Sequence, residues 1–222
     1  SSANAVSFLM FFGMFGSIFL LSQFFQVVQG NSPFQAGLRI LPWTVMPIIV
    51  APIAGILSGR IGGRPILAAG MAMQAVALGW LAATITPTVA YEVVVVPFIL
   101  AGIGMGLFFA PIANVVLSAV RPDQEGKASG ATNTIREVGG VFGVAVLASV
   151  FAANGGYESP AAYVAGLQPA IALGAVIVGL GALAALFIPA RAGAVGAASI
   201  ELELPVAARV GDPAYAYAEV DA

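Results

Sequence analysis

A short polar cluster interrupts the apolar sequence near residue 136. Asn133, Arg136 and Glu137 fall about two to three turns into a predicted helix over residues 128–153. A charge at bilayer depth costs about 2.5–3.5 kcal/mol, so it usually faces a cavity or a partner. We expect Arg136 or Glu137 to line an inner vestibule and to contact a substrate or another helical bundle. The alternative is that both side chains extend to the membrane interface and only anchor the helix.

Three amide side chains in other predicted helices are further candidates for lining a cavity. Gln23 and Gln26 are three residues apart, so they occupy neighbouring positions on one helix face. A face with two amides is expected to look at protein or water, and the alternative is hydration by lipid headgroups near the helix end. Asn114 ends a run of small residues spaced by four, which also includes Gly102 and Gly106.

The sequence lacks the residue sets that catalysis, metal binding or nucleotide binding would require. The sequence contains no cysteine and no histidine, which excludes disulfides, thiolate metal sites and a side chain that titrates near neutral pH. The glycines from Gly102 to Gly106 lack the preceding strand and the further glycine of a dinucleotide fingerprint. No Ser–His–Asp set, metal cluster or phosphate loop is present, so we expect no enzyme activity and no cofactor. The net charge of −2 gives no indication of a nucleic-acid partner.

The composition predicts the elements that must position these residues. The chain has 222 residues, of which 60% are hydrophobic and 8% charged, whereas soluble domains carry about 25% charged residues. Apolar runs of about 20 residues cross a bilayer as helices. The sequence therefore predicts an all-α membrane protein in which six transmembrane helices form one bundle. The expected spans are residues 5–28, 34–57, 66–84, 91–120, 128–153 and 161–188.

Basic residues between the spans predict the orientation of the bundle. Arg60, Arg64, Arg121, Lys127 and Arg191 fall on one side of the membrane, and Arg39 falls on the other. Lys and Arg are retained on the cytoplasmic side. We therefore expect a multi-pass protein of the plasma or inner membrane, with both ends in the cytoplasm. Residues 190–222 are rich in Ala, Gly and Pro and are expected to form a disordered cytoplasmic tail.

Glycines in the predicted helices indicate where helices pack closely. Gly55 and Gly59 form a G-x-x-x-G pair at the end of the second span, and the fifth span carries Gly139, Gly140 and Gly143. We expect the fifth span to lie at the centre of the bundle and to face a second bundle. The third span contains one polar residue and is expected to face mainly lipid.

The segment from Gly55 to Leu67 resembles the G-x-L-a-D-r-x-G-r-k-x-x-L loop of major facilitator superfamily transporters. The matching residues are Gly55, Leu57, Arg60, Gly62, Arg64 and Leu67, whereas Gly59 stands where the family has Asp. That departure is similar to the degenerate second copy of the loop, in the C-terminal half of such transporters. Because this basic turn between two apolar runs is short, we also expect the second and third helices to lie side by side and antiparallel.

Two further segments are similar to drug:proton antiporters of the 14-span EmrB/QacA type. Residues 32–42 match S-P-x-Q-A-G-L…L-P, and residues 126–143 match G-x-A-S-a…N-t-x-R-q-x-G-g-x-x-G, with Glu137 in place of the commoner Gln. The resemblance implies the C-terminal six-helix bundle of a larger transporter, whose N-terminal six-helix bundle is its partner. The opening on Ser1 also leads us to expect a piece of a longer polypeptide.

The same resemblance implies secondary transport across the lipid bilayer. A transporter of this type exports small amphiphilic substrates by alternating access between two bundles, with the proton gradient as its source of energy. Two alternatives remain open. One is a superfamily transporter of a small metabolite, and the other is a non-transporting membrane module that binds a partner bundle.

Overall fold

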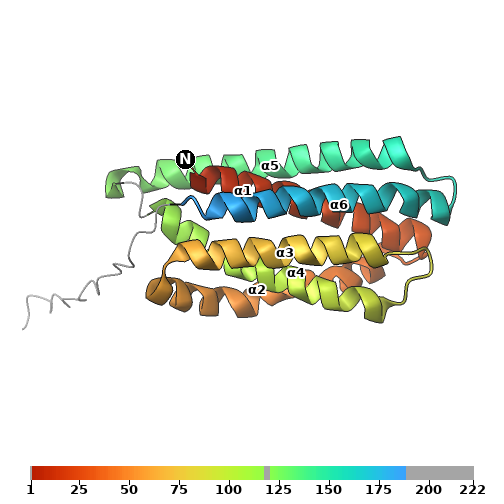
Figure 1. Ribbon diagram of the computed structural model, residues 1–222, viewed down its shortest axis with the longest axis horizontal. Helices are drawn as coiled ribbons and strands as arrows, with labels where there is room; N and C mark the ends of the chain where they lie inside the picture. The colour runs from red at the N-terminus through yellow and green to blue at the C-terminus, as the bar shows by residue number, and fades with distance from the viewer. Residues whose placement is uncertain (1, 118–120, 189–222) are drawn as a thin grey trace, which may run out of the picture.

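The computed structural model describes residues 2–117 and 121–188, and this part of the chain is all helical (Figure 1). Its long helices are α1 (Ser2–Gln23), α2 (Pro33–Ile61), α3 (Gly63–Thr84), α4 (Tyr91–Leu117), α5 (Glu125–Asn154) and α6 (Pro160–Ala185). A π-helical turn, Phe24–Val28, extends α1, and a 3-10 turn, Pro122–Gln124, precedes α5. All six helices are long and apolar enough to span a membrane, which confirms the predicted fold class.

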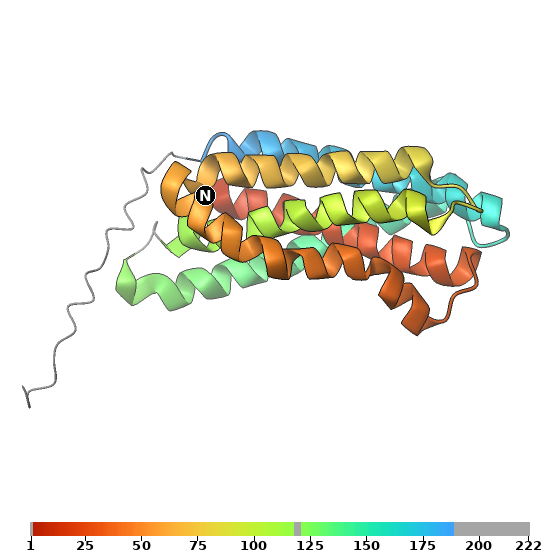
Figure 2. The same cartoon turned by 90° about the horizontal axis from the view of Figure 1, so that it is seen from below.

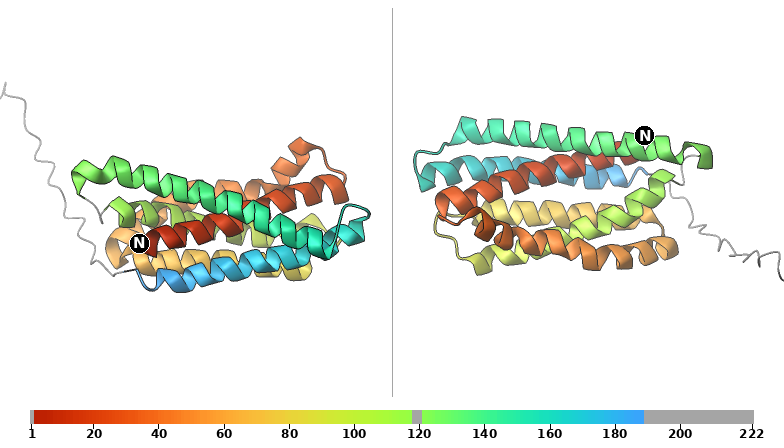
Figure 3. Two further views of the ribbon diagram at one scale, coloured as in Figure 1. Left: turned by 90° about the horizontal axis from the view of Figure 1, so that it is seen from above. Right: turned by 180° about the vertical axis from the view of Figure 1, so that it is seen from behind.

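The helices form two groups of three. In one group α1 packs against both α5 and α6, and in the other α4 packs against both α2 and α3. Figure 2 shows α4 between α3 and α2, and Figure 3 shows α5 crossing over α1. The groups join mainly through α3 and α6, whereas α1 and α4 make few contacts with each other. One side of the bundle is therefore held by a helix pair, and the opposite side is more open.

We name the two ends of the bundle by the chain segments they carry. The proximal end holds the start of α1, the α2–α3 turn and the start of α5. The distal end holds the connections of residues 29–32, 85–90 and 155–159. Arg136 lies about three turns from the start of α5 and therefore belongs to the proximal half.

The segment from Gly55 to Leu67 is almost entirely helical, which corrects the expectation of a loop. Helix α2 continues to Ile61 and α3 begins at Gly63, so only Gly62 interrupts the two helices. Gly62 has a φ of 86°, in the region that favours glycine, and its N–H donates to the Ser58 carbonyl at 3.0 Å. The motif residues Gly55, Leu57 and Arg60 accordingly lie on α2, and Arg64 lies in the first turn of α3.

The turn does not place α2 and α3 side by side along their length, as the sequence had suggested. The two helices touch only near Gly62 and then separate, because α3 packs against α4 and α6. Among the described residues, the expected close helix contact at the G-x-x-x-G pair is not seen. A Cβ at Gly55 would meet only the Ala110 side chain, and one at Gly59 would meet nothing within 4 Å.

Other glycines lie where helices approach closely. A Cβ at Gly102 would come within 2.6 Å of the Trp43 carbonyl, and one at Gly106 within 2.6 Å of the Val50 Cβ. These two positions bring α4 onto α2. On α5, a Cβ at Gly139 would come within 2.6 Å of the Phe8 carbonyl, so α5 lies directly on α1 at this position.

The central helix is α1, which corrects the expectation for the fifth span. Of the six helices, α1 has the largest share of buried residues, whereas α2 and α5 have the smallest. Helix α3 is also less lipid-facing than expected, because a stripe that includes Leu67, Met71, Gln74 and Leu78 is fully buried. The expected tail, residues 190–222, lies outside the described residues.

Candidate functional site

Arg136 is held between aromatic rings of two other helices. Its guanidinium carbon lies 4.3 Å from the centroid of the Phe11 ring on α1 and 5.2 Å from that of Phe109 on α4. The two rings lie 5.9 Å apart and pack edge to face. A cation over the face of an aromatic ring is attracted by the ring quadrupole. The side chain therefore joins α5 to α1 and α4, on the side of the bundle where α1 and α4 otherwise contact each other little.

Polar contacts of Arg136 come from its own helix. Its Nη1 donates to the Asn133 Oδ1 at 3.4 Å, a long hydrogen bond that spans three residues. In the described part of the chain the one ion pair joins Arg121 and Asp123, so no carboxylate there pairs with Arg136. The rings and one amide are thus the groups that offset the desolvation of this half-buried guanidinium.

The placement of Arg136 follows from the glycines that come after it on α5. At Gly139 the backbone of α5 lies against the Phe8 carbonyl, and at Gly143 it lies against the Phe12 carbonyl. A larger residue at either position would push α5 away from α1. The close approach brings the start of α5 within reach of the Phe11 ring, so the glycine motif positions the charge.

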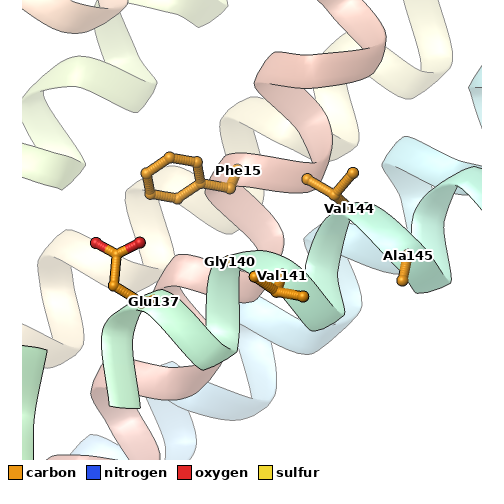
Figure 4. Close-up of a pocket in the computed structure, with 6 residues that line it drawn as sticks. All are labelled: Phe15, Glu137, Gly140, Val141, Val144 and Ala145. Atoms are coloured by element: carbon orange, nitrogen blue, oxygen red, sulfur yellow. The ribbon is translucent and has the colours of Figure 1, made fainter. Parts of the chain in front are cut away.

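Glu137 faces a different environment, a hollow of about 440 Å³ between α1 and α5. The other lining residues are Phe15, Gly140, Val141, Val144 and Ala145. Figure 4 shows the Glu137 carboxylate and the Phe15 ring facing the same region, with Ala145 further along α5. One exposed carboxylate thus lies at the edge of a hollow whose other walls are apolar.

The two charged residues are connected through the aromatic side chains of α1. The rings of Phe11 and Phe15 stack with centroids 5.8 Å apart. Phe11 carries the Arg136 guanidinium on one side, and Phe15 lines the hollow beside Glu137. We call Phe11 and Phe15 the aromatic row. A molecule in the hollow would touch Phe15 and thus the same aromatic row that holds Arg136.

Gln23 and Gln26 do not belong to this site. Gln23 lies eight residues beyond Phe15 on α1, about 12 Å along a helix axis. Its Oε1 accepts a hydrogen bond from the Tyr157 hydroxyl at 2.8 Å, and the Gln26 Nε2 donates to the Ser22 carbonyl at 3.2 Å. Both amides find partners within the distal half of the bundle.

Asn114 is exposed on α4, five residues beyond Phe109 toward the proximal end. The contacts of Arg136 described above, with Asn133, Phe11 and Phe109, do not include Asn114. Of the predicted candidates, Asn133, Arg136 and Glu137 thus lie in the site, and Gln23 and Gln26 lie in the distal half.

Phe11, Phe15 and Phe109 complete the site and were not among the predicted residues. The signal for the first two is the spacing of Phe8, Phe11, Phe12 and Phe15 on one helix, which places aromatic rings on adjoining faces. In an apolar span such rings are indistinguishable from lipid-facing or core residues. Only the position of Arg136 on another helix identifies them.

Comparisons with known proteins agree on one family. The profile of the Major Facilitator Superfamily matches residues 4–208. The Multidrug resistance protein Stp of Mycobacterium tuberculosis is 39% identical over 143 residues, which are 64% of this chain and 26% of that protein. The Methylenomycin A resistance protein of Streptomyces coelicolor is 33% identical over 202 residues, which are 90% of this chain and 41% of that protein.

A third relative and one solved structure extend the comparison. The Multidrug export protein EmrB of Escherichia coli is 29% identical over 137 residues, which are 62% of this chain and 27% of that protein. The xylose transporter XylE from E. coli, in a partially occluded inward-open conformation, has the same fold, with a TM-score of 0.62 at 16% identity. The similarity covers 85% of this chain and 49% of XylE. The chain therefore spans between a quarter and a half of the proteins it matches.

Proposed function

This chain belongs to the major facilitator superfamily, and we propose that it is one six-helix bundle of a transporter that exports small amphiphilic compounds by proton antiport. The relatives named above as multidrug resistance, multidrug export and antibiotic resistance proteins support export as the direction. The observation that carries the proposal is the site on α5. Two charged residues there, Arg136 and Glu137, lie beside an aromatic row and an open apolar hollow.

The chemistry of the hollow suits an amphiphile. Its walls are aromatic and aliphatic, so burial of an apolar group there gains about 25 cal/mol per Å². The Glu137 carboxylate at the edge favours a ligand that carries a positive charge or a hydrogen-bond donor. Because Gln is the commoner residue in the drug:proton antiporters that this segment resembles, we assign Glu137 to substrate preference and not to obligatory proton transfer.

The partner in this proposal is a second six-helix bundle. Helices α2 and α5 have the most exposed surface of the six, and their exposed residues include Ile49, Ile53, Val141 and Phe142. The α5 part of this surface adjoins the hollow, so a bundle that covered it would close the hollow from the other side. Alternating access then requires the two bundles to move against each other around the site.

We place the proximal end of the bundle in the cytoplasm, in a cell membrane. Arg60, Arg64, Arg121 and Lys127 all belong to that end, whereas Arg39 is the one basic residue of the distal half within residues 2–117 and 121–188. The positive-inside rule supports this orientation. In this orientation Arg136 and Glu137 lie in the cytoplasmic half of the transporter.

The experiment is a transport assay on the complete transporter, meaning this chain together with its second bundle. Everted membrane vesicles receive a fluorescent amphiphilic cation, and a pH gradient is applied and then collapsed with an uncoupler. We expect accumulation that depends on the gradient and stops on its collapse. Accumulation driven equally well without a gradient would contradict proton antiport, and no accumulation of any amphiphile would contradict the proposed substrate class.

A further inference from the structure

The distal end of α1 changes from an α-helix to a π-helical turn, Phe24–Val28. Single π turns are rare and frequently mark functional positions. The Gln29 N–H donates back to the Phe24 carbonyl at 3.2 Å, and the Phe25 carbonyl accepts from both the backbone N–H and the side-chain amide of Asn31 at 3.0 Å. These bonds give partners to the Phe24 and Phe25 carbonyls, and the turn ends in the connection to α2.

Arg39 of α2 contacts this turn with its guanidinium. Its Nη1 donates to the Gln29 Oε1 at 2.7 Å, and its guanidinium carbon lies 5.7 Å from the Phe25 ring centroid and 5.4 Å from that of Tyr91. The Gln29 Nε2 in turn donates to the Val89 carbonyl at 3.0 Å, and the Tyr91 hydroxyl donates to the Arg39 carbonyl at 3.1 Å. We call Phe25, Gln29, Arg39, Val89 and Tyr91 the Arg39 cluster.

The cluster fastens α1 to the α2–α4 group at a specific point. Before the π turn, α1 is held by the other group, because the Tyr163 hydroxyl donates to the Leu20 carbonyl at 2.9 Å and the Tyr157 hydroxyl to the Gln23 Oε1. After the turn, Gln29 is held by Arg39 of α2 and by the Val89 carbonyl, in the connection just before α4. The π turn is therefore the segment of α1 that lies between fixed points on the two three-helix groups.

The S-P-x-Q-A-G-L segment explains why Arg39 reaches this point. Ser32 and Gln35 form a reciprocal capping box, in which the Gln35 N–H donates to the Ser32 Oγ and the Ser32 N–H donates to the Gln35 Oε1. The box fixes the first turn of α2. Arg39 follows Gln35 by four residues and so lies on the same face, one turn further along.

We propose that Arg39 is a positioning residue, which clamps the π-helical end of α1 to the starts of α2 and α4 and thereby keeps the distal end of the bundle closed to water. The groups it contacts are neutral: an amide oxygen and two ring faces. The clamp therefore depends on the planar guanidinium, which stacks on rings while donating in its plane, and an ammonium group cannot reproduce both contacts.

The test is the accessibility of a buried cysteine in the complete transporter, reconstituted in nanodiscs so that both ends meet solvent. This chain contains no cysteine, and Val94 is 1% exposed on α4, one turn beyond Tyr91. With Val94→Cys as reporter, we expect Arg39→Gln to raise the rate of labelling by a polar maleimide roughly tenfold, because a charge-assisted hydrogen bond and two ring contacts are lost. Arg39→Lys is expected to give an intermediate rate.

One control variant and one further variant separate the clamp from general effects at this end. Glu92→Gln removes an exposed charge next to Tyr91 and is expected to label as slowly as the parent. Gln35→Ala removes the capping box that fixes the turn before Arg39, so we expect its labelling rate to lie between those of the parent and Arg39→Gln. Equal rates in the parent, Arg39→Gln and Arg39→Lys would overturn the proposal, as would an equal rise in Glu92→Gln. If Arg39→Gln is not recovered folded, Gln29→Leu, which removes the acceptor alone, must show a raised rate for the proposal to stand.

Transport is a second measurement of the role of Arg39, and it is the part of the test that rests on the proposed function. In the transport assay we expect Arg39→Gln to lower the maximal rate several-fold with little change in KM, because the substrate site lies in the other half of the bundle. A raised KM with an unchanged maximal rate would overturn the positioning role. A parent protein that transports nothing would overturn the proposed function alone, and the labelling rates would still decide the role of Arg39.

Discussion

The Arg136 guanidinium on α5 lies over the face of the Phe11 ring on α1, 4.3 Å from its centroid. Ring contacts of this kind contribute about 0.5–1 kcal/mol when exposed and about 2 kcal/mol or more when desolvated. Residues 11 and 136 are far apart in the sequence, so the contact fixes one helix relative to another. Phe109 adds a third helix to the same cation.

We predict that Arg136→Ala lowers transport by the complete transporter at least about tenfold, which corresponds to about 1.4 kcal/mol. Its removal leaves the Phe11 and Phe109 rings without the cation that joins α5 to α1 and α4. Membrane insertion is expected to remain intact, because removal of a charge from a span favours insertion. The measurement is initial transport rate at equal expression, with Lys127→Ala, an exposed cation on the same helix, as the control. Full activity in Arg136→Ala would show that Arg136 only anchors α5 at the membrane interface.

We predict a smaller effect for Glu137→Gln. The carboxylate is exposed at the edge of the hollow, and exposed charge pairs contribute about 0.2–1 kcal/mol. The KM of a cationic substrate is therefore expected to rise by no more than about fivefold, whereas the KM of a neutral amphiphile stays the same. Both are measured together with the pH dependence of transport. Loss of proton coupling in this variant would contradict the assignment of Glu137 to substrate preference and would identify it as a proton carrier.

We predict that two glycine-to-alanine variants, one on α5 and one on α2, change the free energy of unfolding differently. At Gly143 an added Cβ would collide with the Phe12 carbonyl, and backbone cannot move aside as a flexible side chain can. We expect Gly143→Ala to lower the free energy of unfolding by about 1–3 kcal/mol. At Gly59 nothing lies within 4 Å, so Gly59→Ala is expected to be neutral or to gain up to about 1 kcal/mol of helix propensity. Thermal unfolding in one detergent compares the two, and equal midpoints would contradict the assigned α1–α5 contact.

The fold could be predicted from the sequence because bilayer thickness fixes the length of an apolar helix. The spacing of basic and apolar segments then determines how many helices there are and where they begin. Which helices touch is not encoded in that pattern. The short turn at Gly62 suggested an α2–α3 pair, yet α3 packs on α4 and α6, because small residues such as Gly70 and Gly104 let α3 and α4 approach more closely.

The candidate site could be predicted only in part, for a related reason. A charged residue inside a span is visible in the sequence, since its desolvation cost demands a special environment. Its partners are phenylalanines on other helices, and an apolar span is expected to contain many of those. The same holds for Arg39, which looked like one isolated charge on the less basic side and proves to contact Gln29, Phe25 and Tyr91.

We predict from the orientation proposed above that cysteines at the two ends label from opposite sides. Lys127→Cys lies at the proximal end and Thr86→Cys at the distal end, and both positions are exposed. In intact cells an impermeant maleimide is expected to label Thr86→Cys and to spare Lys127→Cys. Permeabilised cells, in which both should label, serve as the control. The reverse pattern in intact cells would place the proximal end outside.

The last prediction concerns this chain without a second bundle. Helices α2 and α5 expose apolar residues, and the hollow beside Glu137 is open on that side, so a substrate there would not be enclosed by protein. Alternating access also requires a second body against which the bundle can move. We therefore expect that expression of residues 1–222 in an efflux-deficient host leaves drug sensitivity unchanged, although the protein is present in the membrane fraction. Co-expression with the second bundle should confer resistance, and Arg136→Ala should strongly reduce that resistance. Resistance conferred by this chain without a partner would contradict the prediction and would indicate that two copies assemble into one transporter.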